Sequence, residues 1–309
     1  MLSQKTAALL KTLADKYETA SFMDGDPSQF LRRYFQPRDQ ELAAFVVSTL
    51  SFGQREQFIA KLNAMFAAAD DWALSSGNGG KPKTARAATG NAGKPKTGGA
   101  SFADWLATGG YKKFFPKSQK KFYRFFSYAD MAELCSRLAQ IVEEHGSLGA
   151  AVRARYGLAN NCGNAKNGDA TKNEGAAPLG LATASGIATV PQELRLVAAL
   201  ISLFPGVKCV SQNPKGACKK LHMFLRWMVR RGSPVDLGLW DWASAADLLI
   251  PLDTHVLQES ARLGLIAPNA AASAKTAIDL TQKMAQVFPG DPARADYALF
   301  GLGVDFESK

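Results

Sequence analysis

The feature that most constrains this chain is the spacing of its apolar residues, which recur every three or four positions. Apolar residues at this spacing lie on one face of a helix, whereas a half-buried strand needs strict alternation. No stretch alternates over enough positions to predict a strand. The sequence therefore predicts an all-α fold, with helices in six stretches: 38–50, 55–69, 130–145, 191–204, 273–288 and 291–304.

Two segments interrupt the helical pattern. Residues 77–100 contain the string GKPKT twice, and residues 157–190 are rich in Gly, Ala and Asn. Neither has enough apolar mass to offset the entropy of ordering its backbone, so both are predicted to be mobile insertions. They separate an N-terminal helical part (1–76), an aromatic and basic helical part (101–156) and a C-terminal helical part (191–309), which we expect to form one two-lobed unit.

Charge and cysteine usage narrow the range of partners. The 309 residues carry a formal net charge of +10, which favours a polyanionic partner such as nucleic acid. The four cysteines form no C-x-x-C pair and no spacing typical of zinc or iron–sulfur ligation, so no metal and no cofactor is predicted.

The apolar runs also bear on location. None approaches the roughly 20 residues that a membrane-spanning helix needs. Residues 1–17 have the spacing of an amphipathic helix and lack the features of a signal peptide. We therefore expect a cytoplasmic monomer without membrane association, located at the nucleoid if its partner is DNA.

One basic segment, residues 208–231, contains no acidic residue. Its last part, CKKLHMFLRWMVRR (218–231), predicts a helix, because four apolar residues share one face: Leu221, Phe224, Leu225 and Met228. Basic residues occupy the remaining surface, which is either a solvated face or a phosphate-binding face. These basic residues are Lys219, Lys220, Arg226, Arg230 and Arg231.

A turn containing Pro214 and Gly216 leads into this helix. Backbone N–H groups at a helix N-terminus, aided by the helix dipole, bind phosphate. The turn, the acid-free span and a second basic cluster together favour the phosphate-binding interpretation. We therefore expect DNA contacts from Pro214, Lys215, Gly216, Lys220, Arg226 and Arg230.

The second basic cluster is YKKFFPKSQKKFYRFFSY, residues 111–128, in which lysines and an arginine interleave with aromatic residues. Such interleaving suits phosphate contacts combined with base stacking. The alternative is that the rings are core and the cations only solvated, and we expect about half of the rings to be core. The predicted DNA-binding residues of this cluster are Lys120, Lys121 and Arg124.

Asp253 lies in the string IPLDTHVLQESARLGL, residues 250–265, where it is placed to cap the next helix. A Gly-containing turn, then Lys219, then an aspartate in the setting PLDTHV resembles the helix-hairpin-helix, Gly/Pro-Asp superfamily of DNA glycosylases. The strings ACKKLHMFLRWMVR, VDLGLW, IPLDTHV and YALFGLGV are similar to those of an uncharacterised bacterial family of that group. The resemblance covers roughly residues 27–305 apart from the two insertions.

The resemblance implies a two-lobed helix-hairpin-helix fold that binds double-stranded DNA, with Lys219 and Asp253 as the catalytic pair. The segment STLSFGQRE is similar to the helix end that approaches the substrate base, which places Gln54 in the base pocket. The gap of 34 residues between Lys219 and Asp253 is similar to the archaeal 8-oxoguanine branch and implies an oxidised purine as the target. Asp236, 17 residues after Lys219, is the alternative acid.

The pair Lys219 and Asp253 suits cleavage of an N-glycosidic bond. Positive charge builds at the anomeric carbon of the sugar, where a carboxylate stabilises it and a neutral amine forms a Schiff base. The base would be flipped out of the duplex into a pocket. The expectation is a base-excision glycosylase with lyase activity at abasic sites, and the alternative is a non-catalytic nucleic-acid-binding protein that keeps the fold.

Overall fold

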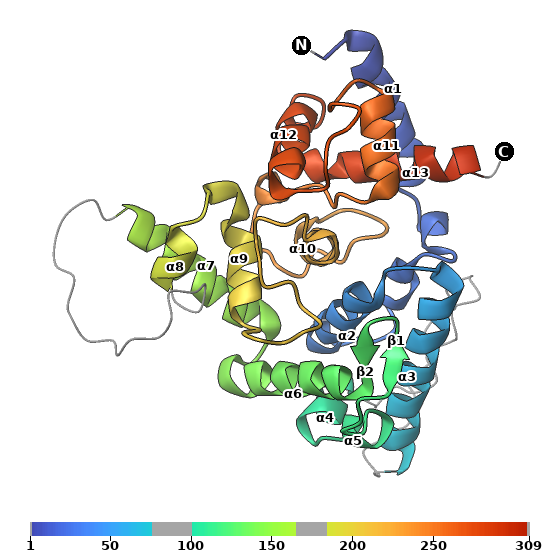
Figure 1. The fold of residues 1–309 in the computed structure, drawn as a ribbon, viewed down its shortest axis with the longest axis vertical. Helices are drawn as coiled ribbons and strands as arrows, with labels where there is room; N and C mark the ends of the chain where they lie inside the picture. The colour runs from blue at the N-terminus through green and yellow to red at the C-terminus, as the bar shows by residue number, and fades with distance from the viewer. Residues whose placement is uncertain (1, 76–100, 165–183, 308–309) are drawn as a thin grey trace.

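The computed structural model describes residues 2–75, 101–164 and 184–307 (Figure 1). Helices account for most of these residues, and the strands among them are the two of one short hairpin, so the mostly helical prediction is confirmed. The insertion at 77–100 lies outside the described residues, as does most of 157–190. The ends of the second insertion are helical, which corrects its predicted boundaries: residues 157–164 and 184–188 belong to helices.

The helices form three groups around one central helix (Figure 1). Helices from both ends of the chain pack together at the top of the picture: α1 (Gln4–Tyr17), α11 (Thr254–Arg262), α12 (Ala274–Ala285) and α13 (Ala295–Glu307). At the bottom lie α2 (Pro37–Leu50), α3 (Arg55–Ser75), α4 (Phe102–Ala107), α5 (Tyr111–Phe114) and α6 (Tyr128–His145), with strands β1 (Lys121–Tyr123) and β2 (Phe126–Ser127).

The third group lies at the left of Figure 1 and contains α7 (Leu148–Asn164), α8 (Ala184–Ala188) and α9 (Arg195–Ser202). Helix α10 (Lys219–Val229) lies between the groups. Short 3₁₀ turns connect the helices: η1 (Ala20–Met23), η2 (Pro27–Phe30), η3 (Gln192–Leu194), η4 (Ala245–Asp247) and η5 (Pro292–Arg294). No helix among the described residues has the length and apolarity needed to cross a bilayer.

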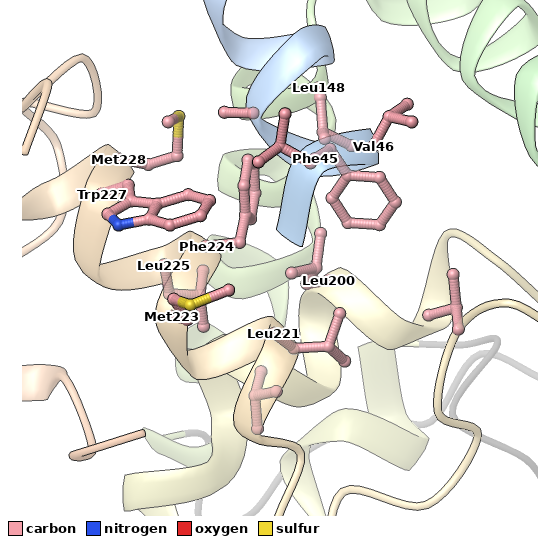
Figure 2. Packing of buried hydrophobic residues seen from close by; sticks show 14 of the residues in the cluster. Phe45, Val46, Leu148, Leu200, Leu221, Met223, Phe224, Leu225, Trp227 and Met228 are labelled. Atoms are coloured by element: carbon pink, nitrogen blue, oxygen red, sulfur yellow. The ribbon is translucent and has the colours of Figure 1, made fainter. Parts of the chain in front are cut away.

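The apolar face of α10 packs into the centre of the core, as its sequence predicts (Figure 2). Phe224 meets Phe45 of α2 edge to face, with ring centroids 5.1 Å apart, and Phe45 in turn stacks on Phe204 at 4.7 Å. Edge-to-face and stacked ring pairs at these distances add to the stabilisation from burial alone. All four residues of the predicted apolar stripe are buried.

Two buried carboxylates of α2 accept hydrogen bonds from the N-termini of neighbouring helices. The Glu41 side chain accepts hydrogen bonds from the backbone N–H groups of Leu148 (2.8 Å) and Gly149 (2.7 Å) at the start of α7, and from the indole N–H of Trp240 (2.6 Å). Asp39 likewise accepts from the N–H of Ala103 (2.9 Å) in α4. An acid at a helix N-terminus satisfies backbone donors that lack a partner within the helix.

The polar face of α10 is buried as well, in a network of ion pairs. Arg230 pairs with Asp236 (2.5 Å), Asp291 (2.8 Å) and Glu18 (2.8 Å). Arg226 pairs with Asp296 at its Nη1, and its Nε lies 3.4 Å from Asp236.

The same network includes an aromatic ring and a third arginine. The Tyr297 hydroxyl donates to Asp236 (2.9 Å), and the Tyr297 ring faces the Arg226 guanidinium at 4.3 Å. Arg32 donates to the backbone carbonyls of Val235 and Asp236. The network therefore joins α10 to α1, to α13 and to the loop after α10.

This network overturns the expectation that Arg226 and Arg230 contact DNA. Their exposed fractions are 4% and 3%, and each guanidinium is paired with carboxylates. Three of the acids, Glu18, Asp291 and Asp296, are far from α10 in the sequence, and Asp236 lies just beyond the acid-free span 208–231, so the span itself does not reveal them. Both arginines are structural residues rather than surface phosphate ligands.

The segment 111–128 also differs from its helical prediction. Only α5 is helical there; β1 and β2 pair antiparallel, with Tyr123 opposite Phe126 and Arg124 in the turn at φ +50°. Tyr111, Phe115, Phe122, Tyr123 and Phe126 are buried and Phe125 is exposed, so more of the rings are core than expected. Aromatic residues suit a strand as well as a helix, and here their packing on the core decides.

Replacing Asp236 with alanine is expected to destabilise the fold by about 3–5 kcal/mol, because Arg226 and Arg230 would remain buried and lose a shared counterion. The free energy of unfolding, measured by urea denaturation, tests this. Asp279→Ala on the exposed face of α12 is the control and should stay within about 0.5 kcal/mol of the parent. A decrease below about 1 kcal/mol for Asp236→Ala would show that the network contributes little.

Candidate active site

A cavity of about 690 Å³ opens where the start of α10 meets segments from all parts of the chain. Its wall includes Lys219 to Leu221 of α10, residues 51–53 after α2, Phe125 of the hairpin turn, residues 251–255 before and within α11, and Asp296 of α13. The volume falls within the roughly 300–1,000 Å³ typical of small-molecule sites. The cavity is large enough to be a binding site for an organic group.

The side chains of Lys219 and Asp253 lie next to each other in the wall of this cavity. The Lys219 Nζ lies 3.8 Å from Asp253 Oδ2, and the side chains are 30% and 18% exposed. Asp253 is the N-cap of α11, as expected: its Oδ1 accepts from the Val256 N–H at 2.9 Å. One oxygen of Asp253 therefore holds the helix, while the other is directed toward the amine.

Asp236, the alternative acid, lies elsewhere. Its side chain is fully buried and is occupied by Arg226, Arg230 and Tyr297. It is not part of the cavity wall. The structure therefore favours Asp253 over Asp236 as the carboxylate beside Lys219.

Besides Asp253, the cavity is lined by the carboxylates of Asp26 and Asp296, and Asp296 was not predicted from the sequence. It is 8% exposed, lines the cavity and pairs with Arg226. Burial raises the pKa of Asp296 to about 7; Arg226 opposes this rise and the nearby Asp253 adds to it. Asp296 follows the predicted start of the last helix, but no sequence signal there distinguishes it from an ordinary first-turn acid.

Lys220 lies in the same cavity, in a less polar setting than Lys219. Its Nζ donates to the carbonyl of Thr49 (3.1 Å) in the last turn of α2 and lies over the rings of Phe52 (4.7 Å) and Phe126 (5.0 Å). Among the described residues, no carboxylate lies within ion-pair distance of it. Burial, opposed by Cys209 and assisted by the neighbouring Lys219 charge, lowers the pKa of Lys220 to about 8.

A turn precedes α10 at the residues for which phosphate binding is predicted. The Gly216 N–H donates to the Asn213 carbonyl (3.1 Å), and the Lys215 N–H donates to the Asn213 side chain (3.0 Å). Lys215 is exposed, but Pro214 is buried, so Pro214 acts through the shape of the turn and not through a surface contact. Helix α10 begins at Lys219, and its N-cap residue Cys218 makes no side-chain cap.

The basic hairpin adjoins the cavity. Lys120, Lys121 and Arg124 are exposed, as a DNA-binding role requires. Phe125, which is 62% exposed, stacks on Phe52 at 5.3 Å, and both rings line the cavity. An exposed aromatic pair beside cations is suited to stacking on a nucleobase.

The loop after α2 holds the hairpin close. The Tyr123 hydroxyl donates to the Phe52 carbonyl. Gly53 has φ +81°, and a Cβ there would lie 2.7 Å from the Tyr123 hydroxyl oxygen and 2.8 Å from Arg124 Cδ, so only glycine allows this approach. Gln54 is exposed and near its α3 neighbour Gln57; its neighbours Gly53 and Arg55 line the cavity, but Gln54 itself does not.

The described residues contain no cluster of three His, Cys, Asp or Glu side chains able to hold an ion. His222 is buried and burial lowers its pKa to about 4, which is typical of a neutral core histidine. His255 lies in the cavity wall and packs edge to face on Phe300 at 5.6 Å.

Comparison with known proteins assigns a family. The chain matches the profile of a family described as a protein of unknown function, DUF2400, over residues 26–84 and 96–305. The chain belongs to the DUF2400 family. No curated protein and no solved structure gives a significant match. The DUF2400 match spans α10, Asp253 and Asp296, so the cavity described above lies within the family region except for Phe22.

The low pKa of Lys220 predicts an amine that reacts at unusually mild pH. In competitive acylation followed by peptide mass spectrometry, labelling of Lys220 should reach half its maximum near pH 8, because the buried ammonium loses its proton there. Exposed Lys113 in the same digest corrects for reagent loss. Labelling of Lys220 that is still rising steeply at about pH 10 would contradict this prediction.

Proposed function

We propose that this protein is a DNA glycosylase with lyase activity, in which Lys219 is the nucleophile and Asp253 the stabilising carboxylate. The observation that carries the proposal is the meeting of these two side chains, 3.8 Å apart, in the wall of a cavity of about 690 Å³. An amine and a carboxylate at one site supply what cleavage of an N-glycosidic bond requires.

The reaction follows from the placement of the two groups. The unprotonated Lys219 amine attacks the anomeric carbon of a flipped nucleotide as the bond to the base breaks, and the bonding electrons leave with the base. The Asp253 carboxylate stabilises the positive charge on the sugar during this step. Opening of the sugar then gives a Schiff base between Lys219 and the sugar carbon, from which strand cleavage proceeds.

The charged surface around the cavity favours duplex DNA as the substrate. Exposed Lys215 lies in the turn before Lys219, while exposed Lys120, Lys121 and Arg124 lie next to Phe125, which lines the cavity from the hairpin. Cations on these two segments would contact the phosphates that flank an extruded nucleotide. The 34-residue spacing of Lys219 and Asp253 supports an oxidised purine as the first lesion to test.

A non-catalytic nucleic-acid-binding protein is the alternative with the same fold. A wide separation of Lys219 and Asp253, or the lack of a cavity between them, would favour it. The short distance and the shared cavity wall favour the enzyme instead.

Lys219→Gln and Asp253→Asn are each expected to abolish base excision and borohydride trapping, because the first removes the nucleophile and the second removes the charge while keeping an N-cap acceptor. The assay is covalent trapping on a panel of duplexes that carry single lesions, beginning with 8-oxoguanine. Lys5→Gln, an exposed position on α1 outside the cavity wall, is the control and should retain trapping. Failure of the parent protein to form any adduct across the panel would refute the lyase mechanism.

DNA binding is expected to depend on the basic hairpin. Alanine at Lys120, Lys121 and Arg124 together should weaken duplex binding and lower the slope of log K against log salt by about 0.9 for every phosphate that is no longer neutralised. Fluorescence anisotropy at several salt concentrations measures both quantities. Lys5→Ala on α1, an exposed lysine at the other end of the molecule in Figure 1, is the control. An unchanged slope in the triple variant would show that DNA binds elsewhere.

A further inference from the structure

Asp296 is a cavity carboxylate to which the proposed function assigns no role. It lies in the first turn of α13 and is held by one oxygen, because Oδ2 pairs with Nη1 of Arg226. Arg226 is fixed in turn by the fully buried Asp236 on its Nε side, at 3.4 Å. The orientation of the Asp296 carboxyl group is therefore set by the buried network.

The other oxygen of Asp296 is available to a ligand. No described residue donates a hydrogen bond to Oδ1. Oδ1 is also not one of the fully buried side-chain atoms that have no hydrogen-bond partner. Asp296 is part of the cavity wall, and Oδ1 is the carboxyl oxygen that its pair with Arg226 leaves open to a group in the cavity. Lys219 and Asp253 line the same cavity, so a group bound beside them lies in the cavity that Asp296 also lines.

The charges around Asp296 suit a group that exchanges protons near neutral pH. Two cations of α10, Arg226 and Lys219, favour its ionised form. Burial, Asp253 before α11 and Asp236 after α10 favour its protonated form, and the balance places its pKa at about 7. A general acid works best when its pKa lies near the working pH.

We propose that Asp296 is the general acid of the proposed glycosylase reaction, donating its proton from Oδ1 to the departing base. This inference rests on the proposed function and adds a second carboxyl role to it. As the bond from Lys219 Nζ to the anomeric carbon forms, the bond from that carbon to the base breaks. The electron pair of the broken bond passes to the base, which takes the proton of Asp296 and leaves neutral.

The products of this step are also accommodated. Asp296 ends as a carboxylate paired with Arg226, so the negative charge that forms on it has a cation already in place. Asp253 keeps its charge throughout and acts on the sugar, while Asp296 acts on the base. Two carboxyl groups with opposite protonation states and different roles are a recurrent solution in glycoside cleavage.

Two DNA substrates separate this role from a structural one. The first is the duplex whose lesion the parent protein excises best, and the second is the same duplex with the base already removed. Loss of the general acid in Asp296→Asn should slow adduct formation on the lesion duplex by about 100-fold or more. Trapping on the abasic duplex should change less than about twofold, because no base has to depart and the asparagine side chain can still meet Arg226.

The pH profile gives a second readout. For the parent protein, adduct formation on the lesion duplex should decline above about pH 7, where Asp296 loses its proton. That decline should be absent in Asp296→Asn and return in Asp296→Glu, which restores an ionisable group. Asp279→Asn, on the exposed face of α12, should match the parent on both substrates.

Each outcome decides between the possibilities. Equal losses on both substrates for Asp296→Asn would assign Asp296 to the structure of the site and overturn the inference. An unchanged rate on the lesion duplex would overturn it as well. If the parent protein is trapped on neither duplex, the proposed function itself fails, and the general-acid role fails with it.

Discussion

The ion pairs of Arg226 and Arg230 are the constraint on which the arrangement of this molecule depends. Two guanidinium groups on α10 are removed from water, and burying charges is unfavourable unless each finds a well-placed partner. The partners come from α1, from the loop after α10, from the residue before η5 and from α13. The helix that begins with Lys219 is thereby locked in position against the helix that carries Asp296.

The cavity forms because the ion pairs of Arg226 and Arg230 fix α10 on one side and apolar packing fixes it on the other. Toward α2, Phe224 packs on Phe45 (Figure 2), and Lys220 is tied to the Thr49 carbonyl. Between these fixed surfaces, the first turn of α10 is left facing open space, with Asp253 on the opposite wall. The chemistry of the site is thus concentrated where the central helix leaves the core.

Much of the fold could be predicted from apolar spacing, because packing of one helix face is a local property of sequence. The helix at 218–231 and its buried stripe were predicted in this way, as was the N-cap role of Asp253. The two arginines were misassigned because the acid-free segment 208–231 resembles a surface, whereas its counterions lie outside it: Asp236 just beyond its end, and Glu18, Asp291 and Asp296 far away in the chain. The segment 111–128 was misassigned because aromatic residues are compatible with strands and helices, and only tertiary packing separates the two.

The candidate site was predicted in part. The convergence of Lys219 and Asp253 came from a resemblance of short strings, and the structure places the two side chains face to face. Asp296 had no such marker, because its importance arises from burial and from four charged neighbours supplied by other segments. Long-range electrostatic environment is a property of the folded chain that residue spacing does not encode.

Because the two oxygens of Asp253 have different partners, the carboxylate is already oriented when a ligand binds. With Oδ1 engaged by the Val256 N–H, the carboxylate plane and its χ angles are fixed by the start of α11 before anything enters. The loss of side-chain rotational entropy is thus incurred during folding and does not recur at each encounter. A glutamate at position 253 is longer and could not both cap α11 and approach the Lys219 amine. The site therefore requires the shorter side chain because of its geometry and not because of its charge.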